Sequence, residues 1–316
     1  AEKGDFVFDV AFSPKDKYLA VSRGPQIHVY NGKTYELIKT LVVDPKLWTR
    51  SIAFSPDGTQ LVAGTQEPAK LRAWNTEDWS EQWHYDIPRG NSDVVASIAY
   101  SPDGTQLAAI HGRAVLFLLP GSGKPTGDLG GLNEVPNQLL FVSNEQLWAF
   151  ALRGKLFVLD PRKRKVSITK EFSDVKVCKR GALNAKDGIA LLAGQTSVNF
   201  VRTKDWSVQG SQRIEDSYNG WDVAHCPAKS WFAHASRTLR LFDDETGEPI
   251  AKREVIRAPN TVMALAFSSD GERLAVGDMF GYLQVIETDR LIQTEEAEQR
   301  ANEVIESDRH QHEEGR

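Results

Sequence analysis

The chain has 316 residues, of which 41% are hydrophobic and 26% charged, and its formal net charge is -5. This composition excludes an intrinsically disordered chain, and two cysteines exclude a disulfide framework or a cysteine-rich zinc site. No stretch of the sequence approaches the length of apolar residues that a membrane-spanning helix needs.

The charge is concentrated at the C-terminus. Residues 287–316 contain ten acidic and four basic side chains, a net charge of -6, which leaves +1 for residues 1–286. A nearly neutral body provides no long-range field that would attract nucleic acid. The chain begins at Ala1 rather than at a Met. Trimming of a longer chain and cleavage after a secretory signal both fit this start, so we expect a cytoplasmic protein, with a secreted or periplasmic one as the alternative.

An internal repeat extends over most of the chain. Segments 8–22, 50–64, 96–110 and 263–277 share one pattern, in which an apolar stretch ends in an aromatic anchor and a Ser-Pro-Asp-Gly type of turn follows. Segment 137–150 is a fifth copy, and two degenerate copies lie between it and the last clear one. Successive anchors are 41 to 46 residues apart, a period that indicates a repeat architecture. In chain order the anchors are Phe12, Phe54, Tyr100, Phe141, Leu183, His225 and Phe267.

Each copy predicts four short antiparallel strands. The first, such as 51–54, is apolar and ends in the anchor, and a second apolar strand, such as 61–64, follows the turn. A third strand with alternating polarity, such as 239–242, leads through a polar hairpin to a more polar fourth strand. Polarity that rises from the first strand to the fourth is typical of radial blades, because the outermost strand meets water. The predicted blades are approximately 6–43, 48–88, 94–132, 135–173, 177–215, 219–256 and 261–293.

The repeat resembles that of the WD-repeat family, and the resemblance covers about nine tenths of the chain. It implies an all-β, seven-bladed β-propeller of four-stranded antiparallel blades over residues 1–293. The family's Trp-Asp dipeptide is degenerate, no Gly-His precedes a first strand, and the buried Asp of the family has a match only at Asp278. We therefore expect the blades to cohere through apolar packing rather than through the family's hydrogen-bonded tetrad. The degenerate dipeptides are Tyr30-Asn31, Trp74-Asn75, Leu159-Asp160, Phe242-Asp243 and Ile286-Glu287.

Ring closure and the C-terminal tail are separate expectations. Segment 287–295 matches the outer hairpin of the first blade, so we expect blade seven to supply its own fourth strand around 290–293. The ring would then close by side-chain packing alone. From Thr294 onward, apolar residues recur at spacings of three and four, which predicts an acidic helix over about 295–307 within a tail of residues 294–316. That tail is either solvated or docked against the propeller or a partner.

The candidate binding site is one rim of the central channel. Residues six and four positions before each anchor should flank the entrance, where the first strands begin. They include two Trp, two Phe, a Met, an Arg and a Lys, a mixture enriched in protein interfaces. Packing of alternate members between blades is the structural alternative. The candidate rim residues are Phe6, Phe8, Trp48, Arg50, Lys179, Trp221 and Met263.

Two features of the outer hairpins have structural explanations. Trp79 and Trp206 occupy the same position of their repeats, which favours packing of the hairpin over a binding role. The basic run 161–165 resembles a nuclear localisation signal or an anion-binding patch, but a solvated hairpin is the simpler interpretation.

Signals for chemistry are weak. His225 replaces the anchor aromatic of blade six, and segment 121–127 lacks the spacing of a phosphate-binding loop. Segment 310–313 contains two His that could hold a metal weakly, but one such pair does not make a metal site. Cys178 and Cys226 are offset on neighbouring first strands, so we expect free thiols rather than a disulfide.

Three functional classes follow from this reading. The first is a non-catalytic scaffold that binds peptide or protein partners at the rim and the channel mouth, with no cofactor, no metal, no nucleic acid and no membrane insertion. The second is an enzyme or cofactor-binding propeller that acts at the channel mouth. The third is a subunit of a larger assembly, which includes an extracytoplasmic one.

Overall fold

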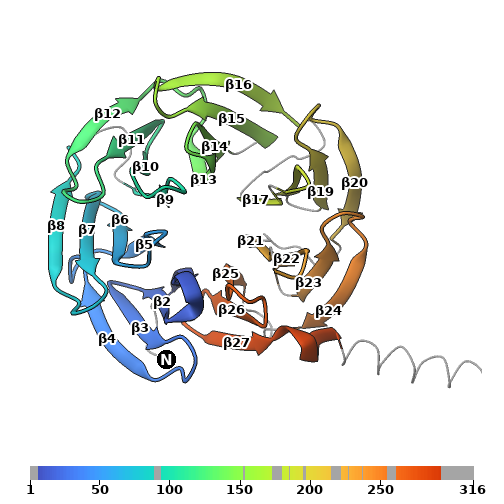
Figure 1. Ribbon diagram of the computed structural model, residues 1–316, viewed down its shortest axis with the longest axis horizontal. Coiled ribbons are helices and arrows are strands. Elements are labelled where there is room, and N and C mark those ends of the chain that lie inside the picture. Colours follow the sequence, from blue (N-terminus) through green and yellow to red (C-terminus); the bar gives the residue numbers. More distant parts are fainter. Residues whose placement is uncertain are drawn as a thin grey trace, which may run out of the picture.

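The computed structural model places seven antiparallel sheets, the blades, around a central axis (Figure 1). It describes residues 6–88, 94–151, 154–172, 180–184, 186–194, 197–214, 222–226, 228–236, 238–254 and 261–292. Six blades have four strands in sequential order, and the seventh has three within the described residues. The predicted seven-bladed, all-β architecture is confirmed. No helix in the described part of the chain has the length and apolar character that crossing a bilayer requires.

The strands follow one another outward from the axis in every blade. Blades one to four consist of β1 (Val7–Phe12), β2 (Tyr18–Arg23), β3 (Gln26–Asn31), β4 (Leu37–Val42), β5 (Thr49–Phe54), β6 (Gln60–Thr65), β7 (Lys70–Asn75), β8 (Glu81–Asp86), β9 (Ile98–Tyr100), β10 (Leu107–His111), β11 (Ala114–Leu118), β12 (Pro125–Leu129), β13 (Pro136–Ser143), β14 (Gln146–Ala151), β15 (Lys155–Asp160) and β16 (Lys165–Glu171). Blades five to seven consist of β17 (Arg180–Asn184), β18 (Ile189–Ala193), β19 (Ser197–Arg202), β20 (Val208–Arg213), β21 (Asp222–Cys226), β22 (Trp231–Ala235), β23 (Thr238–Asp243), β24 (Pro249–Glu254), β25 (Val262–Phe267), β26 (Arg273–Asp278) and β27 (Leu283–Glu287).

Apolar clusters join each blade to the next. Seven separate clusters of buried residues occur, one for each of the seven contacts between neighbouring blades. In the contact between blades three and four, for example, Ile110 and Phe117 pack with Leu139 and Phe157. The second strands are the most buried, and every residue of β6 and β18 is inaccessible to solvent or nearly so. Cohesion by packing of apolar side chains between blades is therefore confirmed.

Short polar turns end the first strands and the third strands. After β5, the Ser55 hydroxyl donates to the Asp57 carboxylate at 2.6 Å and accepts the backbone N–H of Gln60 at 2.9 Å. In blades one, two, four and six, the polar residue at the end of the third strand bonds to the hairpin that follows. The Asn31 side chain, for instance, accepts two backbone N–H groups of its own turn. These residues act locally.

Blades one and seven, which close the ring, meet through a polar contact as well as through packing. Asp16 is 4% exposed in the first turn of blade one and accepts hydrogen bonds from the backbone N–H and the hydroxyl of Ser269 in blade seven, at 2.8 and 2.7 Å. Arg273 lies 3.6 Å from the same carboxylate and donates to the Gly32 carbonyl at 2.5 Å. Closure by side-chain packing alone is therefore wrong, because these bonds supplement the apolar cluster of Val7, Leu19 and their neighbours.

The end of blade seven differs from the prediction. Residues 288–292 are helical, so the fourth strand expected around 290–293 does not form there. Thr288 bonds the start of this helix to the turn between β25 and β26, since its backbone N–H and hydroxyl donate to the Glu272 and Gly271 carbonyls. Leu291 is 3% exposed and packs into the cluster between blades six and seven, which draws the chain away from the edge of β27. Residues 1–5 and the predicted helix over 295–307 lie outside the described residues.

Candidate functional site

Among the described residues, four first strands carry a β-bulge at the same repeat position, near the face of the propeller where these strands begin. In each of them the pairing with the second strand skips one residue, as between Val7 and Asp9 in β1 and between Thr49 and Ser51 in β5. A bulge changes the direction of the side chain relative to the regular alternation of the strand. The skipped residues lie four positions before the anchors and are Phe8, Arg50, Asn137 and Met263. Three of them, Phe8, Arg50 and Met263, are candidate rim residues.

Three aromatic rings form a cluster beside this end of the axis. The Phe6 ring lies 5.5 Å from that of Phe8 and 5.2 Å from that of Trp48, and the Phe8 and Trp48 rings are 5.6 Å apart. The Arg50 guanidinium carbon lies 4.2 Å from the centre of the Phe8 ring, within the range of a cation–π contact. Phe8 is buried, whereas Phe6, Trp48 and Arg50 are half-buried and keep part of their surface accessible. We call these four residues the mouth cluster.

The structure thus brings together four of the seven predicted rim residues. Backbone bonds tie blade one to blade two beside the cluster, since Gly24 donates to the Phe6 carbonyl and accepts from the Thr49 N–H. Met263 is half-buried in β25 of blade seven. Lys179 and Trp221 lie outside the described residues.

A belt of hydrogen bonds links the first strands around the axis. In five blades, the side chain three positions before the anchor accepts the backbone N–H that lies two positions before the anchor of the next blade. The donor and acceptor pairs are Ile52 to Asp9 at 2.9 Å, Ile98 to Ser51 at 3.0 Å, Leu139 to Ser97 at 3.1 Å, Gly181 to Gln138 at 2.6 Å and Leu265 to Asp222 at 2.7 Å.

The two remaining blades have a residue that cannot accept at this position. Blade five has Arg180, whose side chain carries only donors, and blade seven has Ala264. In both cases the following blade supplies its own acceptor: Asp222 accepts the Val223 N–H at 2.9 Å, and Asp9 accepts the Val10 N–H at 3.1 Å. Each of the two aspartates therefore serves two backbone donors, and all seven N–H groups of the belt are bonded.

The charges of the belt influence one another across the axis. Burial raises the pKa of Asp9 to about 6, although Arg180 and the Ile52 N–H act in the opposite direction. Burial also raises the pKa of Asp222, and the Arg180 guanidinium, whose Nε lies 3.7 Å from Asp222 Oδ1, opposes that shift. The pKa of Arg50 is lowered by burial and by the like charge of Arg180.

Sequence reasoning did not find this belt, although the sequence carries a signal for it. A polar residue stands three positions before the anchor in six of the seven copies, within strands that are otherwise mainly apolar. A polar side chain repeated at one position of a buried strand indicates a repeated hydrogen bond, because unbonded polar groups are costly there.

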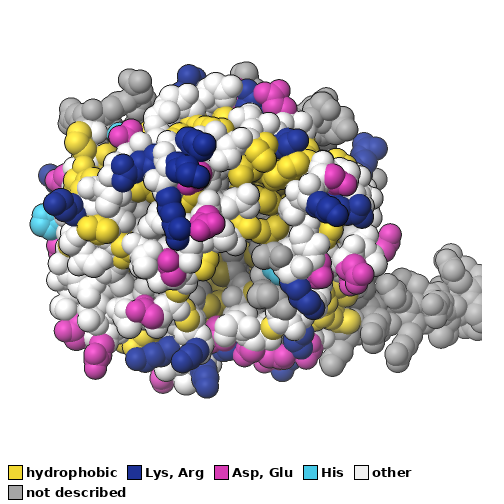
Figure 2. All heavy atoms as spheres, turned by 45° about the horizontal axis from the view of Figure 1, so that its top comes forward, with side chains coloured by type: hydrophobic (Ala, Val, Ile, Leu, Met, Phe, Trp, Pro, Cys, Tyr) yellow, Lys and Arg dark blue, Asp and Glu magenta, His cyan; other side chains and the backbone are white. Residues whose placement is uncertain are grey.

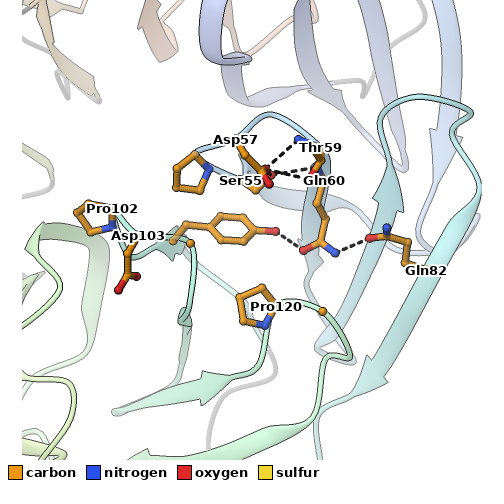
Figure 3. Close-up of a pocket in the computed structure, with 12 residues that line it drawn as sticks. Ser55, Asp57, Thr59, Gln60, Gln82, Pro102, Asp103 and Pro120 are labelled. Carbon is orange, nitrogen blue, oxygen red and sulfur yellow. Dashed lines mark hydrogen bonds between the residues drawn. The ribbon is translucent and has the colours of Figure 1, made fainter.

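A pocket lies on the opposite face of the propeller, between blades two and three (Figure 3). This pocket has a volume of about 540 Å³. The Tyr100 hydroxyl donates to the Gln60 side chain at 2.5 Å, and the Gln60 amide in turn donates to Gln82. Proline rings from both turns and from the blade-three hairpin form walls, and the pocket is lined by Ser55, Pro56, Asp57, Thr59, Gln60, Gln82, Tyr100, Pro102, Asp103, Gly104, Pro120 and Gly121.

The tryptophans of the outer hairpins pack against the preceding blade, as expected. The Trp79 ring lies 4.9 Å from that of Tyr18 in blade one, and the Trp206 ring lies 5.4 Å from that of Trp148 in blade four. Both tryptophans have positive φ, 61° and 63°, which the hairpin geometry imposes. Gly123 has a φ of 65° at the same hairpin position, where a side chain would collide with Trp83.

The basic hairpin of blade four is exposed and partly neutralised. Arg162 forms an ion pair with Glu145 at 3.0 Å, and Lys163 pairs with Asp160 at 3.3 Å. Figure 2 shows basic and acidic side chains side by side over the surface that is turned forward. These pairs fit the interpretation of a solvated charged hairpin.

His225 is more than a replacement for the anchor aromatic. Its Nε2 lies 2.8 Å from the Asp244 carboxylate, which also accepts from the Asn184 amide at 2.9 Å. Asp244 is 2% exposed, so the acceptor of this polar contact between blades five and six is buried. Cys226 is a free, buried thiol, and Cys178 lies outside the described residues.

Comparison of the sequence with protein-family models and with curated proteins gives no match. Within the described ranges, no three His, Cys, Asp or Glu side chains are grouped closely enough to hold a metal ion.

Proposed function

We propose that this propeller is a divergent member of the WD-repeat family and acts as a non-catalytic scaffold that binds a peptide or protein segment at the mouth cluster. The repeated anchor-turn unit and its period near 42 support the family, and the seven blades around one axis agree with it. The propeller fold alone serves many functions, so the argument for binding depends on the site.

The observation that carries the proposal is the composition and exposure of the mouth cluster. Trp48, Phe6 and Arg50 are of the types that dominate the energetics of protein interfaces, and all three remain half-exposed beside one another. Because these rings pack against one another, their accessible parts offer rigid apolar surface at a low cost in side-chain entropy. The cluster also bridges blades one and two, which fixes its geometry.

The polar groups near the axis support a binding role rather than a catalytic one. The Asp9 and Asp222 carboxylates each hold two backbone N–H groups, and the serine hydroxyls of the belt hold one each. Groups occupied in this way maintain the ring. A general base, by contrast, must reach a proton on a substrate.

Selection from a random 12-residue peptide library against the whole chain tests the proposal. We expect enriched peptides that bind the wild type and lose at least tenfold in affinity for Trp48→Ala, since truncating a tryptophan anchor removes about 2 kcal/mol or more. The control is Trp231→Ala, because Trp231 is also half-buried but lies at the opposite end of blade six. Selected peptides with equal affinity for wild type and Trp48→Ala would refute binding at this cluster.

A further inference from the structure

Arg50 is a half-buried cation without a counter-charge among the described residues. Within these ranges no carboxylate or carbonyl oxygen accepts a hydrogen bond from its guanidinium, and its one close partner is the face of the Phe8 ring at 4.2 Å. A guanidinium has five N–H donors in a planar fork that matches a carboxylate. The lowered pKa of Arg50 agrees with partial burial near a like charge. Within the described part of the chain, the fork therefore has no oxygen acceptor and can take one from a partner.

The carboxylates of the belt do not fill this role, because each already has partners. Asp9 holds the N–H groups of Val10 and Ile52, and Asp222 holds two further N–H groups and lies 3.7 Å from Arg180. The charges of the belt are thus matched to one another and to backbone donors. Among the described residues, Arg50 is the charge at the mouth cluster that no carboxylate matches.

We infer that the mouth cluster takes the carboxylate of a Glu or Asp side chain in an acidic peptide segment of a partner protein. Arg50 would bind the carboxylate in bidentate geometry, and the exposed parts of Phe6 and Trp48 would pack against the chain on either side of it. This inference rests on the proposed function and specifies its ligand.

The surroundings favour a peptide over a free anion. Small anions in proteins are commonly held by several converging donors, such as backbone N–H groups of a helix start or a nest. Here the backbone donors of the belt are already bonded, and the ring that faces the Arg50 guanidinium belongs to an aromatic cluster. Aromatic surface around one charged donor matches a peptide, which supplies apolar contact and a charge together.

Three oriented peptide pools provide the test. Each consists of random 11-residue peptides with one fixed central residue, Glu in the first pool, Gln in the second and Lys in the third, and retention by the immobilised whole chain is measured. The wild type should retain the Glu pool about tenfold more than the Gln pool, since a charge-assisted bidentate hydrogen bond in a partly dry site has this effect. Equal retention of the Glu and Gln pools would overturn the inference.

Variants of Arg50 test whether this residue causes a preference for the Glu pool. Arg50→Met keeps an extended side chain over the Phe8 ring without the charge, and should bring retention of the Glu and Gln pools to parity. Arg50→Glu should reverse the preference toward the Lys pool. A preference for the Glu pool that survives in Arg50→Met would overturn the inference, and circular dichroism on both variants establishes that the propeller is folded.

Two further measurements separate this inference from the proposed function. If all three pools are retained equally and Trp48→Ala releases them, the scaffold function stands and the acidic ligand is wrong. If no pool is retained above a matrix control, both are wrong. N-acetylglutamate amide is the small-anion probe, and affinity equal to that of the Glu pool would overturn the assignment to a peptide.

Discussion

Replacement of Asp16 by Gly tests how the ring is closed. Asp16 has a φ of 56° and stands at the turn position where blades two, three and seven have Gly58, Gly104 and Gly271, with φ values of 75°, 69° and 73°. Asp16→Gly therefore restores the residue that this backbone conformation prefers. It removes only the side chain that holds Ser269.

The expected cost follows from the bonds that are lost. Two hydrogen bonds to a charged acceptor, both donated by the exposed Ser269, together contribute about 2 to 3 kcal/mol. Glycine at positive φ returns about 1 kcal/mol. The free energy of unfolding should thus fall by about 1 to 2 kcal/mol, which corresponds to a decrease in Tm of roughly 2 to 4 °C for a chain of this size.

Thermal unfolding and hydrogen exchange measure the effect. We expect faster exchange of the amides of β1 and β25, which lie on the two sides of the closure, with little change in blades three to five. Asp16→Ala should lose about 1 kcal/mol more, because alanine keeps the strained φ. Asp57→Ala is the control, since the hydrogen bonds of Asp57 stay within its own exposed turn. A stability of Asp16→Gly equal to or above that of the wild type, with unchanged exchange at β1 and β25, would refute the closure role.

Three other substitutions test the belt and the packing of the blades. Because burial raises the pKa of Asp9 to about 6, its protonated form is favoured by folding, so this contribution is present at pH 4 and is lost as the pH rises through 6. Relative to Asp9→Asn, urea unfolding of the wild type should lose up to about 3 kcal/mol between pH 4 and 7, and parallel curves would contradict the assignment. Ser97→Ala leaves the Leu139 N–H without its acceptor and should cost about 1 to 2 kcal/mol in the same assay, whereas no change would mean that the belt contributes nothing there. Trp79→Gly loses a buried ring packed on Tyr18 but gains a residue suited to a φ of 61°, so a net loss of about 2 to 4 kcal/mol is expected by thermal unfolding, and a gain would show that backbone strain outweighs packing.

The repeat could be read from the sequence because its signals are local. An anchor such as Phe54, the turn from Ser55 to Gly58 and the apolar second strand lie within 15 consecutive residues, and their hydrogen bonds join residues two to five positions apart. The same locality allowed the positions of Phe8 and Arg50 to be assigned to the mouth of the ring. Counting seven copies then implied seven blades.

Contacts between blades and at the ends of the ring required the tertiary structure. Five of the seven belt bonds join residues more than 40 positions apart, as from Ile52 to Asp9, and Asp16 meets Ser269 across 253 positions. No local pattern encodes such a pair. The helix over 288–292 replaced the expected outer strand for a similar reason, because burial of Leu291 between blades six and seven prevails over the likeness to the first hairpin.

The residue types of the rim could therefore be predicted from the sequence, but their arrangement could not. That Phe6, Phe8 and Trp48 touch one another, and that Arg50 stacks on Phe8, depends on the bulges at Phe8 and Arg50 and on the packing of blade one against blade two. Strand periodicity is a property of neighbouring residues, whereas the direction of a bulged side chain depends on what the neighbouring blade leaves open.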